Sequence, residues 1–461
     1  MQARVKFICS LATVLGLALA VYVARPDRSP ANDQEKPPEA VAEEILHRPT
    51  AMPDRILLTW NDDVATTQAV TWRTDTSVKK GYAQIALAED GPMFTTKSKD
   101  VSSTKQLLDS DLGQAHYHTA HFTDLTPKTL YVYRVGDGVN WSSWTHFRTP
   151  STEAEPFTFI YFGDAQNNLK AHWWRVFREA YADAPRAQFM LHAGDLINRG
   201  SRDAEWGDWV RAGGWVNAMI PSVAIPGNHE YSKYDPNGNE YPDGQRQLST
   251  HWPVLFEFPT NGPDSLSESA YWFDFQGTRF ICLNSNEQID VQTPWLEGVL
   301  KDNPNKWTVV THHHPIYPSS RAQNPEIRDG WQPLYDKYGV DIVLQGHDHS
   351  YGRTGLMGYE QNLPTGVTVQ SEKAGTLYVV SVSGPKQYGR NDFPFVRRAE
   401  DTQLYQIITV DGDELRYDAR TATGALYDAF TLRKRDGEVN ELIERVPDTP
   451  EYRRPEIKKK P

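Results

Sequence analysis

Five short segments of this chain contain aspartate, asparagine and histidine residues, whose oxygen and nitrogen atoms bind divalent metal ions. Each segment follows a short apolar run. In chain order the segments are Gly163-Asp164-Ala165-Gln166, Gly194-Asp195-Leu196-Ile197-Asn198, Gly227-Asn228-His229-Glu230, His312-His313-His314-Pro315 and Gly346-His347-Asp348-His349. Together these residue types predict a two-metal centre, and the chemistry they indicate is metal-assisted hydrolysis of phosphoesters.

The charges of the candidate ligands favour binding of an anionic substrate. Two divalent ions would carry four positive charges, of which Asp164 and Asp195 neutralise two. The other candidate ligands are neutral, and they are Asn228, His313, His347 and His349. The remaining charge would attract a phosphate dianion and lower the pKa of a bound water towards ~7, which produces a hydroxide nucleophile. Asp195 is the expected bridging ligand, because a carboxylate has two oxygens with several lone pairs.

The apolar runs that precede the segments are predicted to be buried strands. They are short, rich in β-branched or aromatic residues, and end at glycine or proline; they cover residues 157–162, 189–193, 222–226, 307–310 and 341–345. Helical spacing between them predicts helices over 171–182, 203–219 and 328–338. Alternating strands and helices predict a layered α/β sheet, whose ligands bind beyond the carboxyl ends of the strands. The five segments would therefore meet at one edge.

The remaining strand patterns predict the domain organisation. Residues 51–150 are predicted to form an all-β sandwich, because short strands alternate there with turn-rich spacers. Residues 151–436 would form the α/β domain, in which strands over 404–410, 414–419 and 427–432 complete a second sheet. The predicted fold is therefore α/β, a four-layer α/β/β/α sandwich that follows an N-terminal all-β sandwich domain. Residues 437–461 are charged and proline-rich and are predicted to be a solvated tail.

The N-terminus has the features of an export segment. Arg4 and Lys6 precede an apolar stretch over 7–23, which contains Ala18-Leu19-Ala20 as a cleavage signal. Residues 1–24 are therefore predicted to be a signal peptide or an uncleaved anchor, followed by a flexible linker over 25–50. Cleavage would leave Cys282 without a disulfide partner, which favours a bacterial periplasmic or envelope protein over an animal secreted one.

Length, charge and hydropathy limit the partners. A chain of 461 residues supports two or three domains. The net charge of −12 argues against nucleic-acid binding, which needs a basic face. A mean hydropathy of −0.62 excludes a multi-span membrane protein. The expected partner is a phosphorylated small molecule, and membrane contact is expected only through the N-terminal anchor.

The five segments resemble the motifs of the calcineurin-like metallophosphoesterases, and within them the purple acid phosphatase branch. The family pattern reads GD, GDxxY, GNHE or GNHD, a VxxH that runs into HxPxY, and GHxH. The resemblance covers roughly residues 50–435. In addition, residues 125–133 resemble the fibronectin type III pattern that precedes the catalytic domain in plant-type purple acid phosphatases, where its expected role is that of a scaffold.

The resemblance assigns a role to each motif residue. It implies that the first metal is held by Asp164, Asp195 and His349. It implies that the second metal is held by Asp195, Asn228, His313 and His347. His229 would be the catalytic histidine, which is not a ligand but contacts phosphate and protonates the leaving oxygen. The metals would be iron, zinc or manganese.

Two positions depart from the purple branch. Asn198 stands where that branch has an iron-binding tyrosine, so the protein should not be purple. Gln166 stands where many non-purple members have a metal-binding histidine, and its amide oxygen could bind the first metal instead. Arg199 follows Asn198, where related phosphatases carry a phosphate-binding arginine, whose fork suits phosphate geometry. His314 is a further substrate-binding candidate, which could point into the site or away from it.

The leading hypothesis is an exported enzyme that hydrolyses phosphomonoesters by attack of a metal-bound hydroxide. A phosphodiesterase acting on nucleotides or lipid headgroups is the enzymatic alternative, because the motifs do not define the pocket. The loops over 231–250 and 318–324, with Lys233, Arg246 and Arg321, are expected to shape it. A surface binding protein without turnover is the alternative from another class, and the complete set of metal motifs argues against it.

Overall fold

The computed structural model describes residues 39–235, 238–359 and 375–454. The predicted export segment over 1–24, residues 25–38 of the expected linker and the last seven residues of the expected tail lie outside the described residues. Within the described ranges, no helix is both long enough and apolar enough to cross a membrane.

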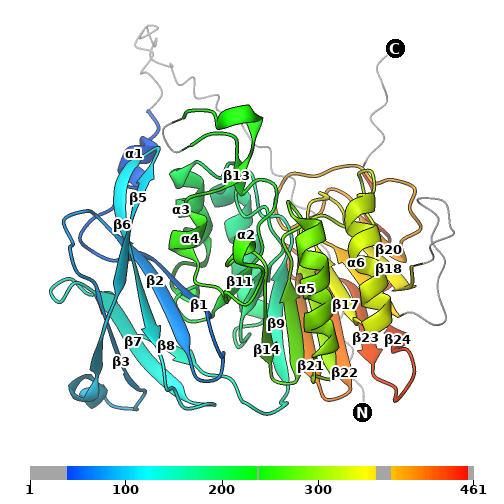
Figure 1. Ribbon diagram of the computed structural model, residues 1–461, viewed down its shortest axis with the longest axis horizontal. Helices are drawn as coiled ribbons and strands as arrows, with labels where there is room; N and C mark the ends of the chain where they lie inside the picture. The colour runs from blue at the N-terminus through cyan, green and yellow to red at the C-terminus, as the bar shows by residue number, and fades with distance from the viewer. Residues whose placement is uncertain (1–38, 236–237, 360–374, 455–461) are drawn as a thin grey trace, which may run out of the picture. The chain divides into compact units, whose positions relative to one another are not determined.

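The N-terminal part is a sandwich of two antiparallel four-stranded sheets, as predicted (Figure 1). Trp72, Phe122 and Phe147 are buried between the two sheets. One sheet has the order β1 (Asp54–Thr59), β2 (Gln68–Thr74), β6 (Gly113–Phe122) and β5 (Thr104–Ser110). The other has the order β4 (Lys99–Ser102), β3 (Tyr82–Leu87), β7 (Leu130–Gly136) and β8 (Thr145–Arg148).

The larger part contains two seven-stranded sheets. The first has the order β11 (Ser222–Ala224), β10 (Met190–His192), β9 (Phe157–Phe162), β21 (Leu404–Asp411), β22 (Glu414–Thr421), β23 (Leu426–Arg433) and β24 (Glu441–Glu444). The second has the order β14 (Tyr271–Phe275), β15 (Thr278–Cys282), β16 (Trp307–His312), β17 (Ile342–Gln345), β19 (Thr376–Val380), β18 (Tyr351–Met357) and β20 (Arg397–Ala399). The strands that precede the five motifs pair in parallel within their sheets.

Helices cover the outer faces of the two sheets, which gives the predicted four layers (Figure 1). On β9, Phe159 faces Phe280 of the second sheet, with ring centroids 5.4 Å apart, whereas Phe162 faces Trp173 of α2 at 4.7 Å. This alternation follows from the two-residue period of a strand. The helices are α2 (Leu169–Asp183) and α3 (Asp203–Gly213) beside the first sheet, and α5 (Ile289–Lys301) and α6 (Pro325–Tyr338) beside the second. Two short elements complete the list, α1 (Glu43–Leu46) and α4 (Trp252–Leu255).

A buried ion pair joins the N-terminal sandwich to α3. Both guanidinium NH groups of Arg55 donate to the Asp203 carboxylate, each at 2.6 Å, and Tyr117 accepts a further bond from Arg55 at 2.8 Å. A second contact comes from β7, where the Tyr133 hydroxyl donates to Ala218 O at 2.7 Å. Removal of one partner from such a buried pair typically costs about 3–5 kcal/mol. These contacts fit the scaffold role expected for the N-terminal sandwich.

The sheet assignment differs from the expected one. The strands β21, β22 and β23, which were expected to complete a second sheet, extend the sheet of β9, and the strands before the motifs are divided between the two sheets.

Three expected elements also differ from the structure. The helix expected over 203–219 ends at Gly213, because Gly214 adopts a φ of +49°, and a short 3-10 turn follows. The expected tail from residue 437 contains β24, which pairs with β23 and extends the first sheet. The end of the expected linker forms α1 and is held by Arg211, which donates to Leu46 O at 2.6 Å.

Candidate metal centre

The candidate residues lie in turns directly after strands, and these turns approach one another closely. Gly346 N donates to His313 O at 3.1 Å, which joins two of the turns. Glycine permits the approach: a Cβ atom at Gly227 would lie 2.3 Å from Asp195 Oδ1, and one at Gly346 would lie 2.3 Å from Asp164 Oδ1. The glycines of the motifs are therefore required by the packing around the two aspartates.

The first group of candidate ligands contains Asp164, Asp195 and His349, whose ligand atoms all lie within 4.8 Å of one another. His349 Nδ1 donates to Lys386 O at 2.8 Å, so Nε2 of the neutral ring carries a lone pair. That lone pair faces Asp164 Oδ2 at 3.3 Å. Asp164 Oδ2 is buried and has no hydrogen-bond partner among the described residues. A cation between these two electron-rich atoms would stabilise the arrangement.

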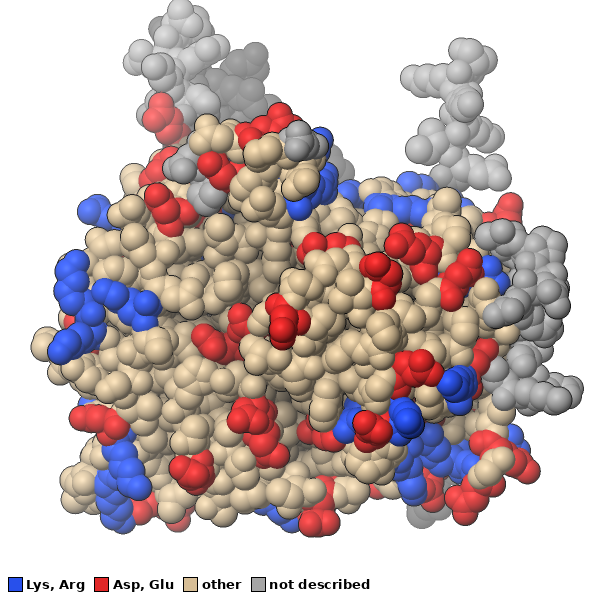
Figure 2. Space-filling view, in the orientation of Figure 1, with Lys and Arg blue, Asp and Glu red and all other residues tan. Residues whose placement is uncertain are grey.

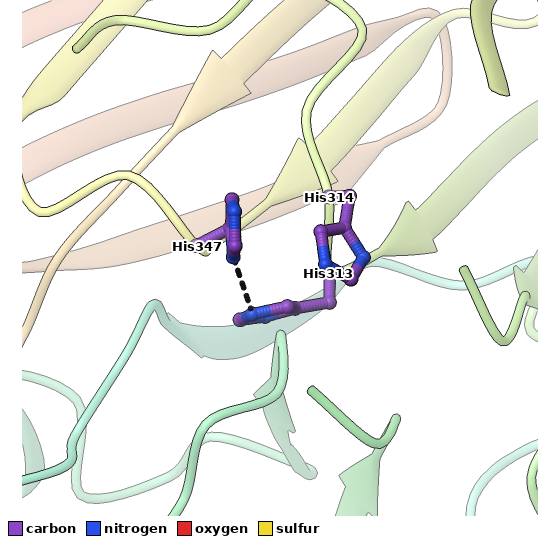
Figure 3. A group of neighbouring side chains, drawn as sticks. All are labelled: His313, His314 and His347. Carbon is purple, nitrogen blue, oxygen red and sulfur yellow. Dashed lines mark hydrogen bonds between the residues drawn. The ribbon is translucent and has the colours of Figure 1, made fainter. Parts of the chain in front are cut away.

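The second group contains Asp195, Asn228, His313 and His347. His313 Nδ1 donates to Ala193 O at 2.9 Å, which directs Nε2 towards Asp195 Oδ1 at 3.3 Å and His347 Nδ1 at 3.2 Å. His347 Nδ1 also lies 2.9 Å from Asn228 Oδ1. Figure 3 shows the rings of His313 and His347 pointing towards each other. Asp195 therefore lies between the two groups, and its carboxylate is a candidate ligand in both.

The protonation of the two groups supports a cation as their partner. Burial, followed by the negative charge of Asp195, raises the pKa of Asp164 well above its ordinary value. Burial alone would lower the pKa of His313, but the carboxylates of Asp195 and Asp164 outweigh it and raise this pKa to about 9. The two carboxylates thus attract positive charge to the space beside His313, where a metal ion would replace a proton, because metal ligands must be deprotonated. The donor set therefore fits two divalent ions that accept carboxylate oxygen, amide oxygen and imidazole nitrogen.

Gln166 lies in the first group, but its orientation differs from the expected one. Its Nε2 donates to Asp195 Oδ2 at 2.6 Å and lies 3.2 Å from His349 Nε2. Its Oε1 accepts from Lys386 Nζ at 3.4 Å and therefore points away from the carboxylates. The amide oxygen was the expected ligand atom, but it accepts a hydrogen bond from the Lys386 ammonium instead.

His229 lies at the open side of Asp195. The ring of His229 has 23% of its side-chain surface exposed, and its Nε2 lies 3.9 Å from Asp195 Oδ2. Its Nδ1 donates to the backbone oxygen of Asn198 at 2.5 Å, and its backbone N donates to Asp195 Oδ1 at 2.9 Å. The ring is therefore held by a neighbouring turn and is not placed among the candidate ligand atoms.

The two other substrate-binding candidates have different surroundings. His314 points towards the second group, because its ring centroid lies 4.3 Å from that of His347 and its Nδ1 lies 2.9 Å from Ser285 Oγ. Arg199 is exposed and lines a cavity of about 580 Å³ together with Asp111. Its backbone N donates to Glu205 at 3.0 Å. His314 is thus brought into the site, whereas the cavity that Arg199 lines contains none of the candidate ligands.

Glu230 supports the site in a way that the motif alone did not indicate. Its fully buried carboxylate accepts backbone N–H groups of Asp195 (2.9 Å), Leu196 (2.8 Å) and Gly227 (2.6 Å). It therefore joins the turn that carries Asp195 to the turn that carries Asn228. A glutamate directly after the histidine of GNHE was the available signal, but only the fold shows which backbone groups it meets.

Replacement of Glu230 by alanine is expected to lower the free energy of unfolding by about 3 kcal/mol, because several buried N–H groups would lose their acceptor. It should also weaken metal binding, because the two turns would no longer be held together. Urea unfolding and metal titration measure the two effects. Glu230→Gln keeps one acceptor oxygen, so its free energy of unfolding should lie between those of the unchanged protein and Glu230→Ala. Unchanged stability in Glu230→Ala would contradict the supporting role.

Asn198 leads to an expectation about colour. The position of the expected tyrosine ligand is taken by Asn198, whose backbone oxygen binds His229. Iron-loaded protein is therefore expected to lack the visible tyrosinate band, which absorption spectroscopy would test after removal of exogenous ligands. Tyr388, with its ring centroid 4.6 Å from that of His349, is the tyrosine to replace by phenylalanine if such a band appears.

Comparison with known proteins agrees with this geometry. Residues 53–149 match the family described as Purple acid Phosphatase, N-terminal domain. Residues 157–351 match the Calcineurin-like phosphoesterase family. The second match begins at β9 and ends at the start of β18, so it contains all five motifs.

Individual relatives align with a large part of this chain. Acid phosphatase type 7 from Homo sapiens is 28% identical over 342 residues, which cover 67% of this chain and 72% of that protein. Purple acid phosphatase 15 from Arabidopsis thaliana is 26% identical over 321 residues, which cover 62% of this chain and 56% of that protein. The solved structure of purple acid phosphatase PPD1 from yellow lupin (Lupinus luteus) seeds has the same fold, with a TM-score of 0.67, 19% identity and coverage of 83% of this chain and 74% of that one. Fold, motifs and matches together place this chain among the calcineurin-like metallophosphoesterases, as a metal-dependent phosphoesterase of the purple acid phosphatase type.

Proposed function

We propose that this phosphoesterase hydrolyses phosphomonoesters. The observation that carries the proposal is a set of three cationic side chains around the candidate ligands. Arg246 donates to Asn228 O at 3.2 Å, Arg321 NH1 lies 2.6 Å from His347 Nε2, and Lys386 donates to Gln166. A monoester at neutral pH is a dianion, whereas a diester carries one negative charge. Additional cations therefore favour the monoester through Coulomb attraction.

The surrounding charges support binding at this place. Arg246 and Lys386 have no carboxylate partner among the described residues, and Arg321 lies 3.8 Å from the buried carboxylate of Asp348. Figure 2 shows Asp and Glu side chains spread over one face of the molecule between separate groups of Lys and Arg. With a net charge of −12, a local group of cations at the metal centre would direct a small anionic substrate there.

Two divalent ions, when bound, would supply positive charge for the phosphoryl group and lower the pKa of a water molecule. Asp164, Asp195, Asn228, His313, His347 and His349 would hold them. His229 presents Nε2 at the open side, because Nδ1 is held by the Asn198 carbonyl. In its protonated form this ring can donate to a phosphoryl oxygen or give its proton to the leaving oxygen. His314, whose ring centroid lies 4.3 Å from that of His347, would contact the same phosphoryl group.

The proposal is supported by the names of two relatives, an acid phosphatase and a purple acid phosphatase. The test is a comparison of 4-nitrophenyl phosphate with bis(4-nitrophenyl) phosphate, using protein loaded with manganese, zinc or iron. We expect a higher kcat/KM for the monoester and loss of activity after chelation. A higher kcat/KM for the diester would establish the phosphodiesterase alternative, and no turnover of either ester with any metal would favour a binding protein.

We further propose that the protein is exported to the cell envelope or beyond. Support comes from Arg4 and Lys6 before the apolar stretch over 7–23. Mass spectrometry of the protein recovered from its native host would detect a new N-terminus after Ala20 if the segment is cleaved. Recovery of the full chain from the cytosolic fraction would contradict export.

A further inference from the structure

Lys386 contacts the first group of candidate ligands through two different atoms. Its backbone oxygen accepts the Nδ1 proton of His349 at 2.8 Å. Its ammonium donates to Gln166 Oε1 at 3.4 Å. Lys386 follows β19, in a segment tied to the site by Gly384 N, which donates to Asp164 O at 2.5 Å. One residue thus holds both an imidazole and an amide of this group.

The two contacts of Gln166 determine which end of its amide faces the carboxylates. In the observed orientation both ends pair a donor with an acceptor: Nε2 with Asp195 Oδ2 at 2.6 Å and Oε1 with Lys386 Nζ. The reversed orientation would place Oε1 against the Asp195 carboxylate and the NH₂ group against an ammonium. Side-chain amide orientation follows the hydrogen-bond network. A cation in the first group would favour the reversed orientation by attracting Oε1, and the Lys386 ammonium opposes it.

We propose that Lys386 is a positioning residue, which holds Gln166 as a hydrogen-bond donor to Asp195 and prevents it from acting as a metal ligand. This inference rests on the proposed two-metal centre. The first position would then have three protein ligands, Asp164, Asp195 and His349. A position with three protein ligands keeps coordination sites free for water and substrate, as catalytic metal sites do.

The experiment is a cobalt(II) titration of metal-free protein, followed by visible absorption and by a competing chelator. Lys386→Met removes the ammonium but keeps the backbone contact to His349. Lys386→Arg keeps a cationic donor. Lys306→Met is the matched control, because Lys306 is exposed and pairs with Asp413. Lys306 directly precedes β16, so it lies at the end of that strand opposite to His313.

In Lys386→Met the amide is expected to turn and add its oxygen to the first metal. The affinity of the first position should then rise by about 10-fold, the scale on which residues around metal ligands act. The molar absorption of cobalt should fall, because its coordination number increases. Lys386→Arg and Lys306→Met should both resemble the unchanged protein.

A double-mutant cycle shows whether the effect passes through Gln166. In a Gln166→Leu background, Lys386→Met should leave the spectrum unchanged and should raise the affinity clearly less than in the unchanged background, because only the loss of the positive charge then acts on the metal. An unchanged or reduced affinity in Lys386→Met, or an equal effect in the Gln166→Leu background, would overturn the proposal while leaving the metal centre intact. Failure of the unchanged protein to bind two cobalt ions would overturn the metal centre, and this proposal with it.

Discussion

Asp195→Ala is expected to lower kcat/KM by about 10⁴-fold, a loss typical of removing a group on which a whole catalytic unit depends. The reason is its position between the two groups. Oδ1 faces His313 at 3.3 Å, and Oδ2 accepts from Gln166 at 2.6 Å. Its loss removes a ligand from both metal positions and leaves Asp164 as the single carboxylate. Steady-state kinetics and metal analysis of the purified variant would measure both effects.

A matched control separates loss of the centre from general loss of charge. Asp413→Ala removes an equal charge from an exposed carboxylate, which pairs with Lys306 at the end of β16 opposite to His313. It should leave activity and metal content unchanged. If Asp195→Ala retained two metals and near-normal turnover, the assignment of Asp195 as the shared ligand would be wrong.

His229→Ala is expected to retain both metals but to lower kcat by about 10²–10⁴-fold, the usual contribution of general acid–base catalysis. The structure separates His229 from the ligand atoms, because its Nδ1 binds Asn198 O and its Nε2 faces the open side. The loss should be larger for alkyl phosphates than for 4-nitrophenyl phosphate, because nitrophenolate leaves without being protonated. Kinetics with a series of leaving groups would measure this dependence.

His172→Ala is a suitable control, because His172 is exposed on α2 and should not affect turnover. Equal losses of activity on good and poor leaving groups, together with loss of metal, would show a different role for His229. The residue would then support the turn that carries Asn228, and protonation of the leaving oxygen would need another group.

The convergence of the motifs was predictable from sequence because it depends on regular features. Each motif follows a buried strand, and parallel strands place their carboxyl ends at one edge of a sheet. This argument applies within each sheet: it brings Asp164 after β9 near Asp195 after β10, and His313 after β16 near His347 after β17. The meeting of the two sheet edges was not predicted, because the sequence does not show that the five strands are divided between two sheets. The strand before each motif is short and apolar, so its position could be predicted without knowledge of the pairing order.

The orientation of individual polar groups was not predictable in this way. Gln166 was expected to offer its oxygen, but its oxygen meets Lys386, which is 220 residues away in the chain. Glu230 meets backbone groups that do not differ in type from those of any other turn. Such contacts depend on the packing of loops that carry no periodic signal. The strand β24 was not predicted for a related reason. Its four residues, ELIE, begin and end with exposed glutamates, so they lack the apolar pattern of a buried strand.

The central claim is that two metal ions lie on either side of Asp195. The most direct measurement is anomalous X-ray diffraction from crystals of the manganese-loaded protein. We predict two anomalous peaks ~3.5–4 Å apart, the separation typical of two-metal sites. One peak should lie beside Asp164 and His349, and the other beside Asn228, His313 and His347. A single peak, or peaks remote from the Asp195 carboxylate, would contradict the account.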